Sequence, residues 1–342
     1  MKAPAFWWRE PGLAAAALAP AAAIWGMAAA RRMAKSGESA PVPILCVGNV
    51  TVGGSGKTPT CLKLAALLRR EGFRPAFLTR GYGGSLAGPI RVDPLRHGSG
   101  EVGDEALLLA RAAPTIVARE RPAGAALAAA LGADLVVMDD GLQNPSLCKD
   151  LAIAVFDGAV GIGNGRVLPA GPLRAPLDAQ WPRIDAVLVI GPGEPGERIA
   201  AEARSRRLPV LRAGLAPARD AALAGHRILA FAGIGRPEKF FATCRALGLD
   251  VAAERSFPDH HPYRADEVKA LLDEADRSGL LPLTTEKDAV RLATLGEAEP
   301  RLSRVRTLPV EVAFEDEEAV AALLRERLSV PSFRHGPQAR AP

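Results

Sequence analysis

A glycine-rich stretch, VGNVTVGGSGKTPT at residues 47–60, constrains the fold more than any other feature of the sequence. The apolar segment 44–47 before it predicts a buried strand, and residues 59–70 after it carry apolar side chains at helical spacing. Small residues between the two let successive backbone N–H groups face a phosphate, and the start of the helix adds its positive end. The sequence therefore predicts a phosphate-binding loop that joins a buried strand to a helix.

The predicted nucleotide-binding residues of this loop are Thr51, Val52, Gly53, Gly54, Ser55, Gly56, Lys57 and Thr58. We expect Lys57 to reach the β- and γ-phosphates of a nucleotide, and the Thr58 hydroxyl to bind Mg²⁺. Thr51 stands where the consensus G-x-x-x-x-G-K-[ST] has its first glycine, whereas the second half, GGSGKT, is intact. The simpler alternative is a glycine turn beside an exposed lysine.

From residue 43 onward, short apolar segments alternate with segments of helical periodicity. This βαβ alternation predicts an α/β fold of the P-loop NTPase type, with a mostly parallel sheet flanked by helices on both faces. The 342 residues exceed the usual size of one domain, and a second series of strands and helices begins near residue 228. We expect four parts: an N-terminal helical segment at 1–40, a phosphate-loop domain at 41–215, a smaller α/β lobe at 225–330 and a disordered tail at 331–342.

Two pairs of acidic residues are candidate ligands or catalysts. Asp139 and Asp140 follow the apolar run LVVM and so are expected at the carboxyl end of a buried strand, where ligands gather in open α/β sheets. One of them can hold Mg²⁺; the alternative is a solvated turn or a helix cap. Asp104 and Glu105 open a predicted helix after Gly103, and taken alone Asp104 fits a helix cap.

Two of the five histidines adjoin in the segment SFPDHHPY, as His260 and His261 after Asp259. Neighbouring side chains point apart on a regular element, so both histidines are not expected to bind one metal ion. A single histidine oriented by an aspartate suits proton transfer near neutral pH. A packed or surface histidine is the simpler alternative.

The N-terminus contains an uncharged stretch, residues 11–30, with Trp7 and Trp8 at its edge and basic residues on both sides. Tryptophans favour the lipid headgroup level and basic flanks attract anionic lipid, so we expect a helix lying at a membrane interface. A membrane span needs about twenty strongly apolar residues, but this stretch is mostly alanine with Pro20 in the middle. A buried alanine-rich helix and a signal peptide are further alternatives.

The charge and the cysteine content argue against several classes of protein. Lys and Arg number 43 against 38 Asp and Glu, for a net charge of +5, and the basic runs are short and without aromatics. We therefore expect no nucleic-acid partner. The cysteines are Cys46, Cys61, Cys148 and Cys244, a spacing that argues against a zinc ribbon or a disulfide scaffold and favours a reducing compartment.

Several motifs occur together in a fixed order: GNVTVGGSGKTP, TRGYGG, GDE, MDDGLQ, GNGRVLPAGPLR, FPDHHPY and LTTEKDAVRL, which span residues 48–292. In order and spacing they closely resemble the tetraacyldisaccharide 4'-kinase family, which makes lipid A in Gram-negative bacteria. The segment before them is similar to that family's membrane-associated helix. Seven ordered motifs are far more specific than a phosphate loop alone.

The resemblance implies phosphoryl transfer from ATP, with Mg²⁺, to the 4'-hydroxyl of a tetraacyldisaccharide 1-phosphate, which gives lipid IVA. The reaction is implied at the cytoplasmic face of the bacterial inner membrane, with the lipid surface as a partner, and we expect a monomer. The implied catalytic residues are Lys57, Asp104 as base and His260 as its partner, with His261 the less favoured choice. The implied metal ligands are Thr58, Asp139, Asp140 and Glu105, and the candidate substrate or phosphate contacts are Arg121, Arg166 and Arg174. Ala175 departs from the family pattern, in which an acid is expected at this position.

Two rival functions use the same phosphate loop. A membrane-associated ATPase switch would hydrolyse ATP without a lipid acceptor and would need no Asp–His pair. A soluble kinase or ligase acting on a small molecule would keep its activity without residues 1–35. Neither explains TRGYGG, GNGRVLPAGPLR and DHHPY together.

Overall fold

The structure, a computed structural model, describes residues 3–217, 221–296 and 298–328, so the tail expected at 331–342 lies outside the described residues. Its larger sheet has nine strands in the order β13-β8-β7-β6-β1-β5-β2-β4-β3. Neighbours from β8 to β4 pair in parallel, and the two edge strands β3 and β13 are antiparallel. The strands are β1 (Ile44–Gly48), β2 (Pro75–Thr79), β3 (Ile90–Arg91), β4 (Thr115–Val117), β5 (Leu135–Asp139), β6 (Leu151–Asp157), β7 (Ala186–Ile190), β8 (Val210–Pro217) and β13 (Val310–Phe314).

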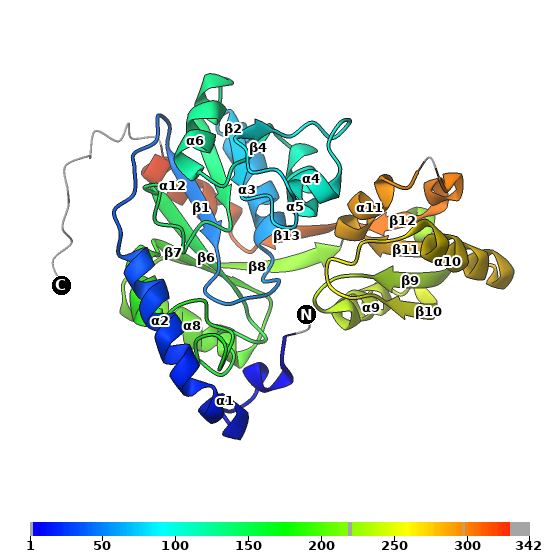
Figure 1. The fold of residues 1–342 in the computed structure, drawn as a ribbon, viewed down its shortest axis with the longest axis horizontal. Helices are drawn as coiled ribbons and strands as arrows, with labels where there is room; N and C mark the ends of the chain where they lie inside the picture. The colour runs from blue at the N-terminus through cyan, green and yellow to red at the C-terminus, as the bar shows by residue number, and fades with distance from the viewer. Residues whose placement is uncertain (1–2, 218–220, 297, 329–342) are drawn as a thin grey trace.

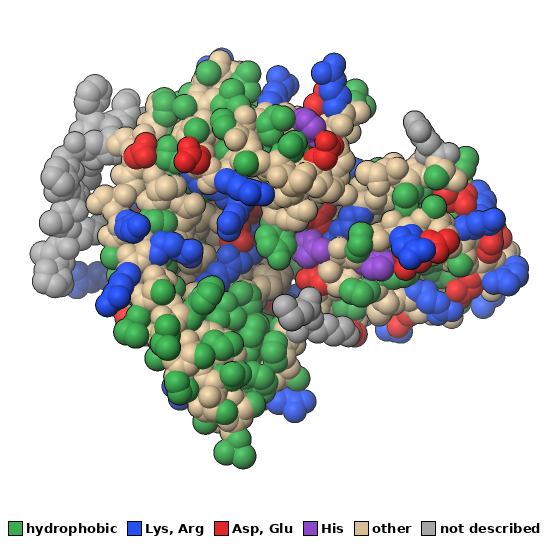
Figure 2. All heavy atoms as spheres, viewed as in Figure 1, with side chains coloured by type: hydrophobic (Ala, Val, Ile, Leu, Met, Phe, Trp, Pro, Cys, Tyr) green, Lys and Arg blue, Asp and Glu red, His purple; other side chains and the backbone are tan. Residues whose placement is uncertain are grey.

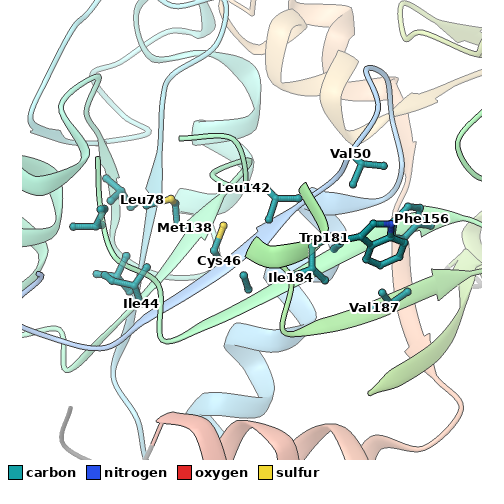
Figure 3. Packing of buried hydrophobic residues seen from close by; sticks show 14 of the residues in the cluster. Ile44, Cys46, Val50, Leu78, Met138, Leu142, Phe156, Trp181, Ile184 and Val187 are labelled. Atoms are coloured by element: carbon teal, nitrogen blue, oxygen red, sulfur yellow. The ribbon is translucent and has the colours of Figure 1, made fainter. Parts of the chain in front are cut away.

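Both faces of this sheet are buried, as the unbroken apolar strands predict. Alternate residues of β1 point to opposite faces: Ile44 and Cys46 belong to one apolar cluster, Leu45 and Val47 to another. The first cluster contains Trp181 and Phe156 (Figure 3). The flanking helices of the large sheet are α3 (Lys57–Arg70), α4 (Ser99–Val102), α5 (Asp104–Ala110), α6 (Arg121–Ala130), α7 (Leu177–Gln180), η2 (Trp181–Arg183), α8 (Glu194–Ser205) and α12 (Glu317–Leu328). The expected α/β architecture is confirmed.

A second, smaller α/β lobe projects to one side of the large sheet (Figure 1). Its parallel sheet has the order β10-β9-β11-β12, and helices pack on both faces. Its elements are η3 (Ala221–Leu223), β9 (Arg227–Ala232), α9 (Pro237–Ala246), β10 (Asp250–Ser256), α10 (Ala265–Ser278), β11 (Leu281–Thr285), α11 (Glu286–Ala293), η4 (Pro300–Arg304) and β12 (Arg306–Leu308).

The chain does not end in this second lobe, although the sequence analysis assigned residues 225–330 to it. Strand β13 returns to the large sheet and pairs antiparallel with β8. Val312 of β13 and Leu324 of α12 are buried in the same cluster as helix α3. Apolar periodicity predicts that a strand and a helix form here but not which sheet they join, so the two lobes are connected by two chain crossings.

The N-terminal segment forms η1 (Ala5–Trp8), α1 (Leu13–Ala17) and α2 (Ala19–Met33). One face of α2 packs on the body, because a side chain on Gly26 would contact Pro176 and Met33 is buried. The opposite face and α1 leave an apolar surface exposed, at the lower left in Figure 2, formed by Leu13, Ile24, Trp25 and Met27. Within the described residues no helix combines the length and the hydropathy that crossing a membrane requires.

The N-terminal segment also rests on the loop 163–174. The Trp7 indole N–H donates to the Pro169 carbonyl at 3.0 Å, and the Trp25 indole N–H donates to the Arg174 carbonyl at 3.2 Å. The Asn164 backbone N–H donates to the Trp7 carbonyl at 2.8 Å. The apolar surface of α1 and α2 is therefore held in a defined position relative to Arg174.

A substitution at Phe77 tests the assignment of the core, because this residue lies on β2 and none of its surface is exposed. We predict that Phe77→Ala lowers the free energy of unfolding by about 3–5 kcal/mol, since the cavity cannot close fully. Leu95, which is 96% exposed, provides the control, and Leu95→Ala should change stability by less than about 0.5 kcal/mol. Urea unfolding followed by circular dichroism measures both; equal stabilities of the two variants would refute the assignment.

Candidate active site

The loop between β1 and α3 has the geometry of a phosphate cradle. Gly53 and Gly56 adopt φ of 108° and 90°, which other residues rarely reach, and a side chain on Gly56 would collide with Ile190. Around Gly53 and Gly54 the space is open. The Ser55 hydroxyl is buried and has no hydrogen-bond partner among the described residues. The strand, loop and helix thus follow one another as the sequence predicts, with α3 beginning at Lys57 itself.

Lys57 points from this loop toward the carboxyl ends of β1 and β5. Its Nζ donates to Asn49 Oδ1 at 3.2 Å and lies 3.8 Å from Asp140 Oδ2. Strands β1 and β5 pair with Val47 beside Asp139, so the acidic pair after β5 lies next to the loop after β1. The predicted acid, lysine and loop are therefore brought together at one edge of the sheet.

Asp139 is buried with 1% of its surface exposed, and its Oδ2 has no hydrogen-bond partner among the described residues. The Cys61 thiol lies 3.6 Å from Oδ1. Burial, followed by the charges of Glu105 and Asp140, raises the pKa of the Asp139 carboxyl to about 7. An unpaired buried carboxylate is costly, and this position therefore favours a cation or a proton.

Asp140 differs from its neighbour because it is paired. Arg174 donates to both of its carboxylate oxygens, at 2.8 and 3.0 Å, and also to the Thr51 carbonyl at 2.9 Å. Burial would raise the pKa of Asp140, but the charges of Lys57 and Arg174 lower it. Arg174 thereby joins the loop 163–174 to both the acidic pair and the first residue of the phosphate loop.

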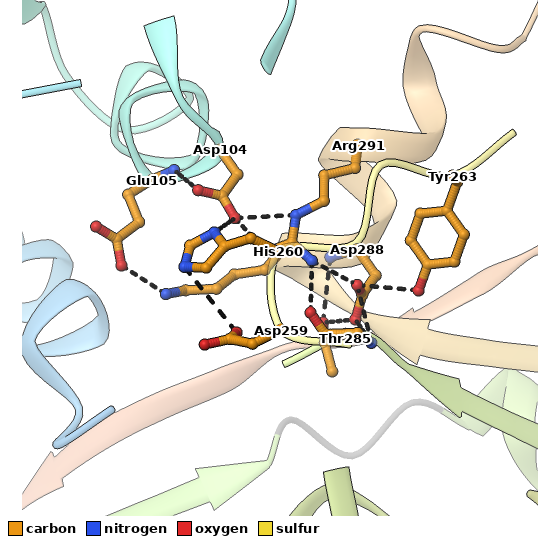
Figure 4. Close-up of polar contacts among 10 residues, drawn as sticks. Asp104, Glu105, Asp259, His260, Tyr263, Thr285, Asp288 and Arg291 are labelled. Atoms are coloured by element: carbon orange, nitrogen blue, oxygen red, sulfur yellow. Dashed lines mark hydrogen bonds and ion pairs between the residues drawn. The ribbon is translucent and has the colours of Figure 1, made fainter. Parts of the chain in front are cut away.

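A second cluster forms where the two lobes meet, around Asp104 at the start of α5 (Figure 4). Arg291 of α11 donates to Asp104 Oδ2 through Nη2 and, at 3.0 Å, through Nε. His260 places Nδ1 3.4 Å from the same oxygen. Asp104 and Arg291 are 4% and 7% exposed, so this ion pair across the lobes is buried.

The protonation states of Asp104 and His260 follow from the groups around them. Burial would raise the pKa of the Asp104 carboxyl, but the hydrogen bond with His260 and the charge of Arg291 hold it well below its usual range. The hydrogen bond with Asp104 raises the pKa of His260, against a smaller lowering by burial. Asp104 is therefore a carboxylate at neutral pH and stabilises a positive charge on the His260 ring.

Asp288 positions Arg291 from within the second lobe. It is fully buried and accepts hydrogen bonds from the Gly233 N–H, the Tyr263 hydroxyl, the Thr285 hydroxyl and Arg291 Nη1. The Arg291 Nη1 group also donates to the Gly233 carbonyl at 2.7 Å. The guanidinium thus has partners on both lobes and a fixed orientation.

Glu105 is paired with a residue that the sequence analysis missed, Lys287, whose Nζ lies 2.6 Å from Oε1. Lys287 and Arg291 stand four residues apart on α11, so they share one helix face and contact two consecutive acids of α5. Their motif, LTTEKDAVRL, contributed to the family resemblance, but nothing in its spacing shows that it faces the other lobe.

The two adjacent histidines have different environments. His260 and Asp140 have positive φ angles of 56° and 54°. Residues with strained backbone conformations of this kind are frequent at functional sites. His261 turns away and places Nε2 3.0 Å from Glu267 Oε2 within the second lobe. The structure therefore brings His260, and not His261, to Asp104.

The other two candidate arginines, Arg121 and Arg166, differ in their surroundings. Arg121 is 2% exposed and donates to the Ala118 carbonyl at 2.5 Å, while its Nε has no partner among the described residues. Burial lowers its pKa to about 10, although Asp139 opposes this. Arg166 is exposed, and in the described part of the chain no hydrogen bond or ion pair joins its side chain to the other candidates.

Comparison with known proteins finds similar chains over most of the length of this one. The sequence profile of the family described as tetraacyldisaccharide-1-P 4'-kinase (LpxK) matches residues 14–329. Proteins named tetraacyldisaccharide 4'-kinase from Methylobacterium sp. (strain 4-46) and Bradyrhizobium sp. (strain ORS 278) are 62% and 51% identical; each alignment covers 96% of this chain and 97% or 98% of the relative. The crystal structure of the "apo" form of LpxK from Aquifex aeolicus in complex with ATP is similar, with a TM-score of 0.71 and 25% identity over 92% of this chain and 99% of that chain.

The buried pair across the lobes gives a prediction for stability. Arg291→Met removes the arginine that the buried carboxylates of Asp104 and Asp288 share, which should lower the free energy of unfolding by about 3–5 kcal/mol at pH 7. Because the folded-state pKa of Asp104 is lowered, its stabilising effect is present above the unfolded value of about 3.9 and is lost as the pH falls further. The deficit of the variant should therefore shrink below about pH 4.

Arg301→Met is the matched control, since Arg301 also bonds several carboxylates but is 32% exposed. Exposed pairs contribute at most about 1 kcal/mol. Urea unfolding of both variants between about pH 2 and pH 8 measures the difference. A pH-independent deficit, or equal losses in the two variants, would contradict the role of the Asp104–Arg291 pair.

Proposed function

Because the chain belongs to the tetraacyldisaccharide-1-P 4'-kinase family, we propose that it transfers the γ-phosphoryl group of ATP to the 4'-hydroxyl of a tetraacyldisaccharide 1-phosphate. The product is lipid IVA, an intermediate of lipid A biosynthesis. The observation that carries this proposal is the Asp104–His260 pair, with Nδ1 3.4 Å from the carboxylate, at the junction of the two lobes. An ATPase needs no such acid–base pair.

We propose that residues 51–58 bind the nucleotide. The open space around Gly53 and Gly54, the unpartnered Ser55 hydroxyl and the inward direction of Lys57 support this assignment. The Aquifex aeolicus LpxK structure is described as a complex with ATP. In this chain Lys57 would contact the β- and γ-phosphates, and backbone N–H groups at the start of α3 would bind the phosphate oxygens.

The acidic residues at the sheet edge fit Mg²⁺. Asp139 Oδ2 is a buried carboxylate oxygen without a partner, and Thr58, at the start of α3, is also buried. Oxygen ligands of this kind, together with nucleotide phosphates and water, suit Mg²⁺. We propose Thr58, Asp139, Asp140 and Glu105 as the residues that hold it. When bound, Mg²⁺ supplies positive charge to the phosphate oxygens.

The proposed chemistry is a single displacement. Asp104 and His260 accept the proton of the 4'-hydroxyl as its oxygen forms a bond to the γ-phosphorus, and the bond from that phosphorus to the β,γ-bridging oxygen breaks, so that ADP leaves. Since Asp104 is held as a carboxylate by Arg291, the proton comes to rest on His260, whose pKa is raised. Positioning and charge neutralisation account for most of the catalysis in this class of reaction.

We assign different roles to the three arginines. Arg174, which bonds Asp140 and the Thr51 carbonyl, is placed to contact a phosphate if Asp140 turns to the metal. Arg121, with an unpartnered Nε beside the charge of Asp139, is a second candidate contact. Arg166 is exposed, and we propose it only as a contact to the lipid substrate.

The exposed apolar surface of α1 and α2 supports attachment to a lipid surface. Leu13 and Ile24 are 91% and 68% exposed, and Arg31 and Arg32 lie in the last turn of α2. Apolar side chains next to basic ones suit the interface of an anionic bilayer. We propose a monomer bound peripherally to the cytoplasmic face of the inner membrane, where a lipid substrate is within reach of the junction between the phosphate-loop domain and the smaller lobe.

The kinase proposal predicts transfer of radiolabelled γ-phosphate from ATP to purified tetraacyldisaccharide 1-phosphate in detergent. Lys57→Ala, Asp104→Ala and His260→Ala should each lower the rate by at least about 100-fold, since they remove phosphate binding or the proton acceptor. His226→Ala is the control, because His226 is exposed in the turn before β9. Acceptor-independent ATP hydrolysis that is lost in Lys57→Ala, without labelled lipid, would favour the ATPase switch instead.

Membrane attachment predicts that the triple variant Leu13→Glu, Ile24→Glu, Met27→Glu binds vesicles of phosphatidylethanolamine and phosphatidylglycerol at least tenfold more weakly. Each change places a charge where an apolar side chain would enter the interface. Vesicle sedimentation measures binding, and Leu95→Glu is the matched control at an exposed leucine elsewhere. Unchanged binding by the triple variant would show that this surface does not contact lipid.

A further inference from the structure

Lys287 enters the candidate metal site from the opposite lobe. It lies in the first turn of α11, and its Nζ forms a 2.6 Å ion pair with Glu105 Oε1, although 182 positions separate the two residues in sequence. The side chains of Lys287 and Glu105 are 31% and 24% exposed, so the contact is shielded but open to solvent. No step of the proposed phosphoryl transfer involves Lys287.

The charges around Lys287 are mainly negative. Burial would lower the pKa of the Lys287 ammonium group, but the charges of Glu105 and Asp104 raise it, and Asp139 adds to the effect. Each of the other acids has its own partner, with Arg291 on Asp104 and Arg174 on Asp140, whereas Asp139 Oδ2 has none among the described residues. Lys287 and Lys57 both place positive charge near Glu105 and Asp139: Lys287 acts more strongly on Glu105, and Lys57 acts more strongly on Asp139.

In the described part of the chain, the carboxylates around Lys287 do not share one ligand position. Among residues 3–217, 221–296 and 298–328, no group of three or more His, Cys, Asp or Glu side chains is gathered to hold a metal ion. A lysine ammonium is a compact point charge on a flexible stem. It can occupy the oxygens that a divalent cation would use, and it can leave them without a change of fold.

We propose that Lys287 is a resident counter-cation of the metal site, which pairs with Glu105 in the nucleotide-free enzyme and opposes binding of a divalent metal ion in the absence of nucleotide. The inference rests on the proposed kinase function and deepens it. Mg²⁺ is bound in such sites by one or two carboxylates together with substrate phosphates. When nucleotide phosphates add their negative charge, Lys287 gains a second partner and releases Glu105, so that metal and nucleotide bind together.

The test is direct measurement of Mn²⁺ binding to the full-length protein without nucleotide, by electron paramagnetic resonance of the free ion. Lys287→Met leaves Glu105 and Asp139 without this cation, so its affinity for Mn²⁺ should rise at least tenfold over wild type. Lys287→Arg keeps the charge and should bind as weakly as wild type. The double variant Lys287→Met, Glu105→Gln should lose the gain.

Lys63→Met is the matched control, because Lys63 forms a similar 2.7 Å pair with Glu317 away from the site. An unchanged or weaker Mn²⁺ affinity in folded Lys287→Met would overturn the proposal. If that variant does not fold, a crystal structure of the wild type with Mn²⁺ and a non-hydrolysable ATP analogue decides. The proposal requires Lys287 Nζ to have left Glu105, and an intact Lys287–Glu105 pair in that complex would overturn it.

These outcomes are independent of the lipid acceptor. Absence of lipid phosphorylation by wild type would refute the proposed function while the Mn²⁺ measurement still reports on Lys287. Conversely, if wild type phosphorylates the lipid but Lys287→Met does not change the Mn²⁺ affinity, only the proposed counter-cation role of Lys287 is refuted.

Discussion

The buried ion pair between Asp104 and Arg291 is the interaction on which the candidate active site depends. It joins the first turn of α5 to the last turn of α11, and thus the large sheet to the smaller lobe. A buried charge is tolerated only when it is paired and hydrogen-bonded, so the two lobes satisfy each other's charges. The same contact orients Asp104 toward His260 and brings Lys287 to Glu105. Docking of the lobes and assembly of the acid–base pair are therefore one event.

A second set of contacts connects the site to the N-terminal segment. Arg174 bonds Asp140 and the Thr51 carbonyl, and the loop that carries it accepts hydrogen bonds from Trp7 and Trp25. The helices α1 and α2, which Figure 1 shows at the lower left, are thereby held in place relative to the loop 51–58. The proposed attachment to a lipid surface requires such a fixed relation, because it would hold the candidate catalytic groups at a constant height above that surface.

The sequence predicted the elements with the strongest local signals. The glycine loop after an apolar strand, the acids after β5 and the helices on both sheet faces follow from spacing and periodicity alone. Local sequence patterns could not predict contacts between distant segments. In the sequence, Lys287 and Arg291 are typical polar residues of an amphipathic helix. The segment of β13 has the pattern of one more strand of the second lobe. Strand β10, whose residues are exposed or half-buried, carried too weak an apolar signal to be predicted. The pairing of His260 with Asp104 came from the family resemblance rather than from spacing.

Asp104 and Arg291 form an ion pair directly across the lobes. A double-mutant cycle with Asp104→Asn and Arg291→Met, followed by urea unfolding at pH 7, measures that interaction. We expect a coupling free energy of at least about 2 kcal/mol, because Arg291→Met loses the Asp104 ion pair only where Asp104 is charged. The effect of Arg291→Met on the buried Asp288 is the same in both backgrounds and cancels in the cycle. Additive effects, within about 0.5 kcal/mol, would contradict this direct interaction.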